Sequence, residues 1–131
     1  HMIHSVDSVK LMAEIERQAE KHNVESINIL IQVNMSKEES KFGIDIEEVD
    51  ELLDFAKTLQ RVKVCGLMTI LAKVDSEMSN RLQFRDINNK FIDISRNTYD
   101  NIDMKFLSMG MSGDFEMAIE EGSNMVRIVA Y

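Results

Sequence analysis

Five short runs of apolar, often β-branched residues recur along this chain, and longer segments with apolar residues at helical spacing separate them. The intervening segments are long enough for helices that cross from one strand to the next. The sequence therefore predicts strands and helices in alternation, which implies a parallel sheet with right-handed connections. The expected strands are Ile3–Val6, Ile27–Val33, Val62–Ile70, Met104–Ser108 and Met125–Ala130.

The same patterns place the helices and order the strands. Helical spacing predicts a helix over Asp7–His22, a second capped by Asp45, a third beginning at Ser76 and a short one from Phe115 to Gly122. Because Ile27–Val33 is an almost unbroken apolar run, that strand is expected to be buried on both faces. We expect the second and third strands at the centre of the sheet, and Ile3–Val6 and Val126–Ala130 at its edges.

Composition indicates one small acidic domain. The chain has 131 residues, 44% hydrophobic and 29% charged, with a net charge of −8. That charge argues against nucleic acid or an anionic membrane as partner, because either needs a basic face. One cysteine, Cys65, has no Cys or His neighbour, which argues against a metal site and suits a reducing cytoplasm. We set aside His1 and Met2 as resembling a tag remnant, and expect a single domain over residues 3–131.

Ligands of parallel α/β folds gather at the carboxyl ends of the strands. The most informative segment there is the turn from Ser108 to Asp114, with glycines at 110 and 113. Backbone N–H groups in such a turn, with the hydroxyls of Ser108 and Ser112, suit a phosphate. The alternative is a plain strand-to-helix turn in which Ser112 caps the helix and Asp114 satisfies its dipole.

Two further side chains are open to two interpretations. Arg127 lies between apolar residues of the last strand, so its charge must be paired. It faces either an anionic ligand or a carboxylate or carbonyls within the sheet. His4, at the end of the first strand, either contacts a ligand or is a solvated or capping histidine.

Several stretches together resemble one known family. They are IHSVDS (3–8), ILIQVN (29–34), KEESKFG (37–43), VCGLMTI (64–70) and LSMGMSGDFEMAIEEGSNMVRI (107–128). They resemble the YggS-type pyridoxal-phosphate homeostasis family, relatives of the alanine racemase N-terminal barrel. The resemblance implies a (β/α)₈ barrel that holds pyridoxal 5′-phosphate and buffers the cofactor without established catalysis. It places the cofactor against Ser112, Gly113, Arg127 and Met68, to which the turn adds Ser108 and Met109.

The chain also departs from this family. A barrel of eight units needs about 200–250 residues, whereas this chain supplies five strands at most. The segment with the family's Schiff-base lysine is missing, and Val129-Ala130 stands where the family has Gly-Thr. The chain thus looks like the C-terminal five-eighths of such a protein, truncated naturally or by engineering, with impaired cofactor binding.

A sheet cut from a barrel has two unpaired edges and an exposed inner face. Either two copies associate, through the sheet edge or the former barrel interior, or the sheet flattens into a flavodoxin-like three-layer sandwich. We expect a homodimer. Two other functions stay open: a racemase-like enzyme that uses His4 and Tyr131 for proton transfer, and a scaffold fragment without a ligand.

Overall fold

The computed structural model describes residues 2–35, 43–69, 77–97, 99–110 and 115–126. Within these ranges, strands and helices alternate along the chain as the sequence predicts. The order is β1 (Met2–Val6), α1 (Val9–Lys21), β2 (Ile27–Gln32), a 3₁₀ turn η1 (Ile46–Glu48), α2 (Val49–Ala56), β3 (Val62–Met68), α3 (Glu77–Ser95), β4 (Ile102–Ser108) and α4 (Phe115–Glu120).

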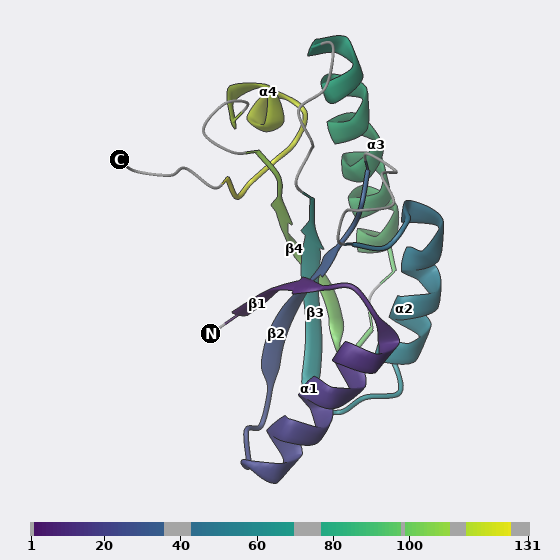
Figure 1. The fold of residues 1–131 in the computed structure, drawn as a ribbon, viewed down its shortest axis with the longest axis vertical. Coiled ribbons are helices and arrows are strands. Elements are labelled where there is room, and N and C mark those ends of the chain that lie inside the picture. The colour runs from purple at the N-terminus through teal and green to yellow at the C-terminus, as the bar shows by residue number, and fades with distance from the viewer. Residues whose placement is uncertain (1, 36–42, 70–76, 98, 111–114, 127–131) are drawn as a thin grey trace.

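The four strands form one parallel sheet in the order β1-β2-β3-β4 (Figure 1). The expected central place of β2 and β3 and the edge place of β1 are confirmed. A flavodoxin-like sheet would instead place the second strand outside the first. The flavodoxin-like alternative is therefore wrong, and the strictly sequential order is that of an arc of a parallel barrel.

The main core lies between one face of the sheet and the helices. Its buried members come from all four strands and from α1, α2 and α3; examples are Met12, Ile31 and Phe84. A smaller cluster lies apart from it and joins Leu30, Cys65 and Met68, with further apolar side chains packed against them. Since side chains alternate along a strand, Leu30 lies on the opposite face from its neighbours Ile29 and Ile31. Burial of β2 on both faces is thus confirmed.

Local polar contacts fix the element ends. Ser8 caps α1, since its hydroxyl accepts a hydrogen bond of 3.0 Å from the Leu11 N–H. The expected second helix begins as η1 after Asp45, whose side chain makes no capping bond. Met2, which we set aside with His1, is the first residue of β1 and pairs with Asn28.

The fifth expected strand is described only at its start. Met125 forms an isolated parallel bridge with Ser108, so the chain returns to the free edge of β4. Residues 127–131 lie outside the described residues. None of the described helices combines the length and apolar character that crossing a bilayer requires.

Candidate functional site

Two predicted site residues lie side by side at the carboxyl edge of the sheet. Met68 ends β3, Ser108 ends β4, and the two are register partners. Met68 belongs to the small apolar cluster, together with Phe106. Because Ser108 follows Phe106 by two residues, it shares the face of the sheet on which that cluster lies. The structure thus brings Met68 and Ser108 together on the face away from the core helices.

The Ser108 hydroxyl is the least satisfied group at this edge. The residue is 1% exposed, and its Oγ has no hydrogen-bond partner among the described residues. A buried hydroxyl without a partner costs about 1–3 kcal/mol, so such groups are uncommon in native structures. It lies at the carboxyl edge of a parallel sheet, where ligands of such folds gather, so it is a candidate hydrogen-bond donor to a ligand.

The strand ends around Ser108 are held firmly together. The Thr69 hydroxyl donates a 2.7 Å hydrogen bond to the Val33 carbonyl, and the Thr69 N–H donates to the Ser108 carbonyl at 3.0 Å. The Val33 N–H donates to the Met68 carbonyl at 2.8 Å. These bonds continue the sheet past the last strand residues and give the edge a fixed geometry.

The turn after β4 is described through Gly110, whose φ is +101°. That conformation favours glycine. Met109 is buried in the main core cluster on the helix side, so its side chain does not share the face of Met68 and Ser108. The other candidates in and after the turn, namely Ser112, Gly113, Arg127 and Tyr131, lie outside the described residues.

Sequence reasoning missed two residues that follow α4. Ser123 is 8% exposed, and its Oγ lies 2.8 Å from the Met109 carbonyl oxygen and 2.8 Å from that of Met125. The side chain of Asn124 accepts from the Leu107 N–H at 2.7 Å and donates to the Lys105 carbonyl at 2.8 Å. The signal that could have found them is the turn-forming Gly-Ser-Asn sequence directly after a short helix.

His4 is far from this pair. It lies in β1, which is three strand spacings from β4, or about 14 Å across a sheet of this kind. His4 is therefore not a direct neighbour of Met68 or Ser108 in the sheet. Tyr131, its partner in the racemase-like alternative, lies outside the described residues, so that alternative stays untested. Cys65 lies in the small apolar cluster, and its burial raises the pKa of the thiol, which favours the neutral form.

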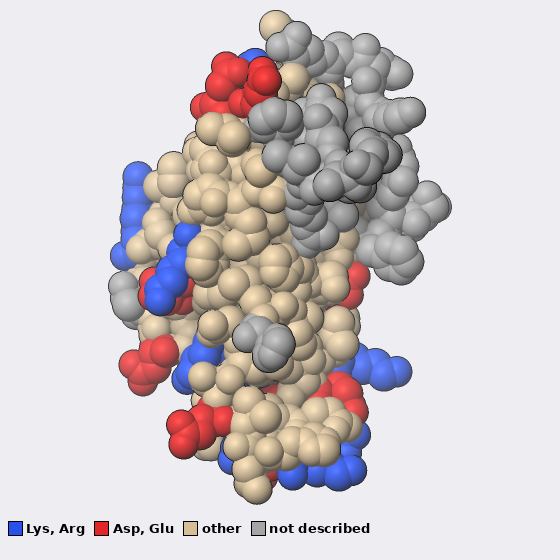
Figure 2. Space-filling view, turned by 90° about the vertical axis from the view of Figure 1, so that its left-hand side faces the viewer, with Lys and Arg blue, Asp and Glu red and all other residues tan. Residues whose placement is uncertain are grey.

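The surface over the open face of the sheet is mainly uncharged. Figure 2 views the molecule from the side away from α2 and α3, and much of its middle carries neither acidic nor basic residues. In the described ranges, no group of three His, Cys, Asp or Glu residues could hold a metal ion. The described part of this face suits an uncharged ring better than a cation.

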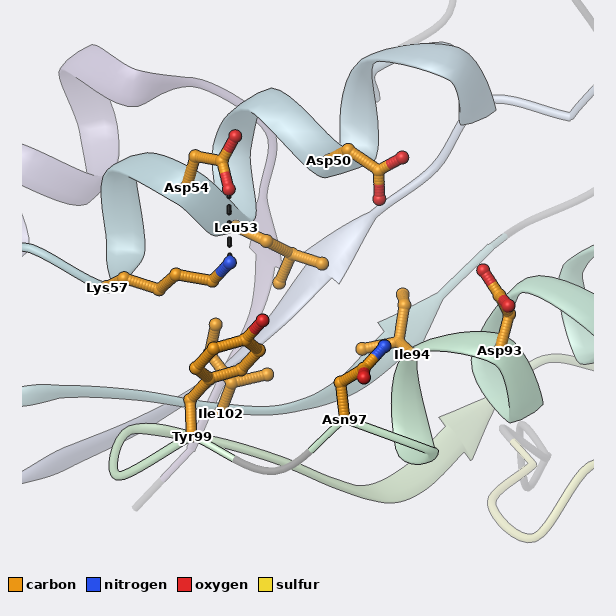
Figure 3. Close-up of a pocket in the computed structure, with 9 residues that line it drawn as sticks. All are labelled: Asp50, Leu53, Asp54, Lys57, Asp93, Ile94, Asn97, Tyr99 and Ile102. Atoms are coloured by element: carbon orange, nitrogen blue, oxygen red, sulfur yellow. Dashed lines mark hydrogen bonds and ion pairs between the residues drawn. The ribbon is translucent and has the colours of Figure 1, made fainter.

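A separate hollow of about 220 Å³ lies between α2 and the end of α3 (Figure 3). It adjoins Ile102, the first residue of β4, so it lies at the amino end of the sheet. Its charges are partly compensated: Lys57 pairs with Asp54 at 3.1 Å and lies 4.0 Å from the centre of the Tyr99 ring. This hollow has no connection with the carboxyl-edge residues.

A second hollow of about 370 Å³ lies beside the edge strand β1, on the helix side of the sheet. Its lining is largely apolar and comes from β1, α1 and the start of β2. The lining residues are Ile3, Glu14, Ile15, Gln18, Ala19, His22, Val24 and Ile27.

Comparison with known proteins gives one family for nearly the whole chain. A family model described as the N-terminal domain of alanine racemase matches residues 1–128. A pyridoxal phosphate homeostasis protein of Aquifex aeolicus is 41% identical over 127 residues, which are 97% of this chain and 54% of that protein. The chain spans about half the length of the curated relatives that it matches. The prediction that the chain is the C-terminal five-eighths of such a protein is not supported. The comparisons show a match to about half the length of the relatives.

Solved structures agree with this assignment. A protein of Bifidobacterium adolescentis described as unknown has a TM-score of 0.90 and 37% identity, covering 97% of this chain and 50% of that one. PipY of Synechococcus elongatus, solved with PLP bound, has a TM-score of 0.82 and 27% identity over 97% of this chain and 57% of its own. An alanine racemase of Clostridium difficile, 17% identical, has a TM-score of 0.68 and covers 95% of this chain and 31% of that one. The expected partial-barrel fold is confirmed.

Proposed function

Since the chain belongs to the family of the alanine racemase N-terminal domain, we propose that it is part of a barrel that binds pyridoxal 5′-phosphate. The observation that carries this proposal is the buried hydroxyl of Ser108, which lies beside Met68 at the carboxyl edge and has no hydrogen-bond partner in the described part of the chain. The similarity to pyridoxal phosphate homeostasis proteins and to PipY, which was solved with PLP bound, supports it. The described residues fit the cofactor, because they offer a donor for its phosphate and an apolar wall for its ring.

Each described residue has a simple role in this proposal. The Ser108 hydroxyl donates to a phosphate oxygen, Met68 covers the ring, and Thr69 holds the ends of β2, β3 and β4 in place through the bonds given above. When bound, the cofactor supplies an aldehyde that reacts with amines. In this chain no lysine matches the family's Schiff-base motif, so retention rests on the phosphate and on apolar contact. We further propose a buffering or carrier role without catalysis, in the cytoplasm, on the similarity to pyridoxal phosphate homeostasis proteins. We expect impaired affinity for the cofactor, because Val129-Ala130 stands where the family has Gly-Thr.

Calorimetric titration with pyridoxal 5′-phosphate and with pyridoxal, which lacks the phosphate, tests the proposal. We expect the phosphate ester to bind more tightly than pyridoxal, and Ser108→Ala to weaken the ester about tenfold, the effect of a charge-assisted hydrogen bond of about 1.4 kcal/mol. Ser95→Ala is the control, because it removes a serine hydroxyl at the end of α3, where that hydroxyl donates to the Ile92 carbonyl. Equal binding of both compounds by the wild type and by Ser108→Ala would refute the proposal.

An absorbance spectrum after gel filtration tests the missing lysine separately. We expect the cofactor to leave the protein on the column. A persistent imine band would show that a lysine of this chain does form the covalent link, against our assignment.

For this chain by itself we also propose a homodimer. β1 lies at the edge of the sheet that the described residues form, and an apolar hollow lies beside it. A second copy of the chain with the same apolar surface is the simplest cover for this hollow, and a symmetric dimer is the commonest closed assembly.

Light scattering tests the dimer. We expect twice the mass of one chain, and dissociation on Val24→Glu, because Val24 lines the hollow and is an exposed apolar residue. Leu82→Glu is the control, since Leu82 is an exposed apolar residue of α3. A monomer at high concentration would contradict the proposal.

A further inference from the structure

Backbone and side-chain hydrogen bonds join the segment that follows α4 to the end of β4. The Asn124 N–H donates to the Leu107 carbonyl at 3.2 Å, and the Met109 N–H donates to the Met125 carbonyl at 3.0 Å. The side chains of Ser123 and Asn124 add the four bonds given above. We call Ser123 and Asn124 the clasp.

Ser123 is the centre of the clasp. Its single hydroxyl hydrogen lies within reach of three carbonyl oxygens, those of Met109 and Met125 at 2.8 Å and that of Leu107 at 3.2 Å. The residue is buried, and its own N–H donates to the Ala118 carbonyl at 2.9 Å. Through its side chain and its backbone N–H together, this one residue connects the end of β4, α4 and Met125.

Contact with α3 also holds the clasp in place. Gly122, directly before it, has a φ of +113°, and a Cβ there would lie 2.5 Å from the Asn88 side chain of α3. The chain therefore turns at Gly122 in close contact with α3. Asn124 then bonds both a backbone N–H and a carbonyl of β4, as a neighbouring strand would.

The position of the Met109 carbonyl fixes the direction of the Gly110 N–H. A trans peptide group is planar, so its C=O and the following N–H point in opposite directions. Because Ser123 binds the Met109 carbonyl oxygen, the Gly110 N–H must point away from Ser123. In the sequence, Gly110 comes two residues after Ser108, whose buried hydroxyl has no hydrogen-bond partner among the described residues.

We propose that Ser123 and Asn124 are positioning residues, which fix the end of β4 so that the Ser108 hydroxyl and the Gly110 N–H are presented to the phosphate of a bound ligand. The inference rests on the proposed function, because it assumes that an anionic group binds at this edge. Neither clasp residue touches the ligand; each acts through the backbone of Leu107 to Gly110.

Titrations of Ser123→Ala, Ser123→Thr and Asn124→Ala with pyridoxal 5′-phosphate, inorganic phosphate and pyridoxal test the inference, with Ser95→Ala as control. We expect Ser123→Ala and Asn124→Ala to bind the phosphate ester and inorganic phosphate about tenfold more weakly, by analogy with other lost buried hydrogen bonds. Ser123→Thr keeps the hydroxyl and should bind within about twofold of the wild type. The affinity for pyridoxal, which has no phosphate, should not change.

Thermal unfolding in the same samples separates positioning from plain stability. If the alanine variants melt at lower temperature but, while folded, bind the phosphate compounds as well as the wild type does, the inference is wrong. Should Ser123→Ala fail to fold, Asn124→Ala decides by the same criterion. If the wild type itself binds no phosphate compound, the proposed function is wrong, and so is the positioning role that rests on it. If the wild type binds and the alanine variants bind equally well, only the positioning role is wrong.

Discussion

The carboxylate of Glu16 controls the start of the central strand β3, and its removal should be costly. Glu16 lies on α1, and its Oε1 accepts hydrogen bonds from the Arg61 N–H at 2.9 Å and the Val62 N–H at 3.0 Å. Its Oε2 adds longer bonds to the N–H groups of Arg61 and Gln60. Hydrogen bonds to a charged group contribute about 1.5–3 kcal/mol each, but water can reach these partly buried amides in an alanine variant. We therefore expect Glu16→Ala to lose about 2–3 kcal/mol in total.

Urea unfolding followed by circular dichroism measures this loss, which corresponds to about 10 °C in Tm for a domain of this size. Glu16→Gln keeps one acceptor oxygen and should lose about half as much. Glu20→Ala is the matched control, because Glu20 is an exposed glutamate on the same helix. The reasoning is refuted if Glu16→Ala unfolds within about 0.5 kcal/mol of Glu20→Ala, a difference typical of ordinary surface substitutions.

Two further predictions concern packing and pH. A Cβ at Gly66 would overlap the Phe106 carbonyl oxygen and lie 2.8 Å from Leu30 Cδ2, so Gly66→Ala should destabilise the fold by about 1–3 kcal/mol; an unchanged urea midpoint would contradict this. Hydrogen bonds from Arg85 and Arg81 lower the pKa of the Glu121 carboxyl below its usual 4.5. A lowered folded-state pKa gives stability that is present above about pH 4.5 and lost as the pH falls through the folded value. The urea midpoint should therefore drop in that acidic range, and less steeply in Glu121→Gln; identical pH profiles would disprove the link.

The sequence predicts the sheet well because its signals there are local. An almost unbroken apolar run such as 27–33 is enough to predict a strand buried on both faces, and the alternation with helices is enough to predict a parallel sheet. The start of β4 was placed two residues late, at Met104 instead of Ile102, since the polar Asp103 interrupts the apolar run. The choice between a barrel arc and a flavodoxin-like sheet depends on strand order, which no residue pattern within one strand encodes.

The site was predictable only in part, for a similar reason. Met68 and Ser108 end neighbouring strands, so parallel pairing brings them together. Met109 was placed in the site although, one residue after Ser108, its side chain lies on the helix side. Ser123 and Asn124 were missed because their partners are backbone groups of residues 105–109, and a contact between a side chain and a distant carbonyl leaves no periodic pattern in the sequence.

The most direct test of the central claim is a nuclear magnetic resonance titration of the ¹⁵N-labelled chain with pyridoxal 5′-phosphate, read at individual backbone amides. Our account predicts that the amides of Thr69, Ser108 and Gly110 shift in a saturable manner, while those of Asp54 and Lys57 beside the amino-end hollow stay unchanged. If the carboxyl-edge amides stay in place while the cofactor is added to excess, or if the shifts cluster at Asp54 and Lys57 instead, the cofactor does not bind where we place it.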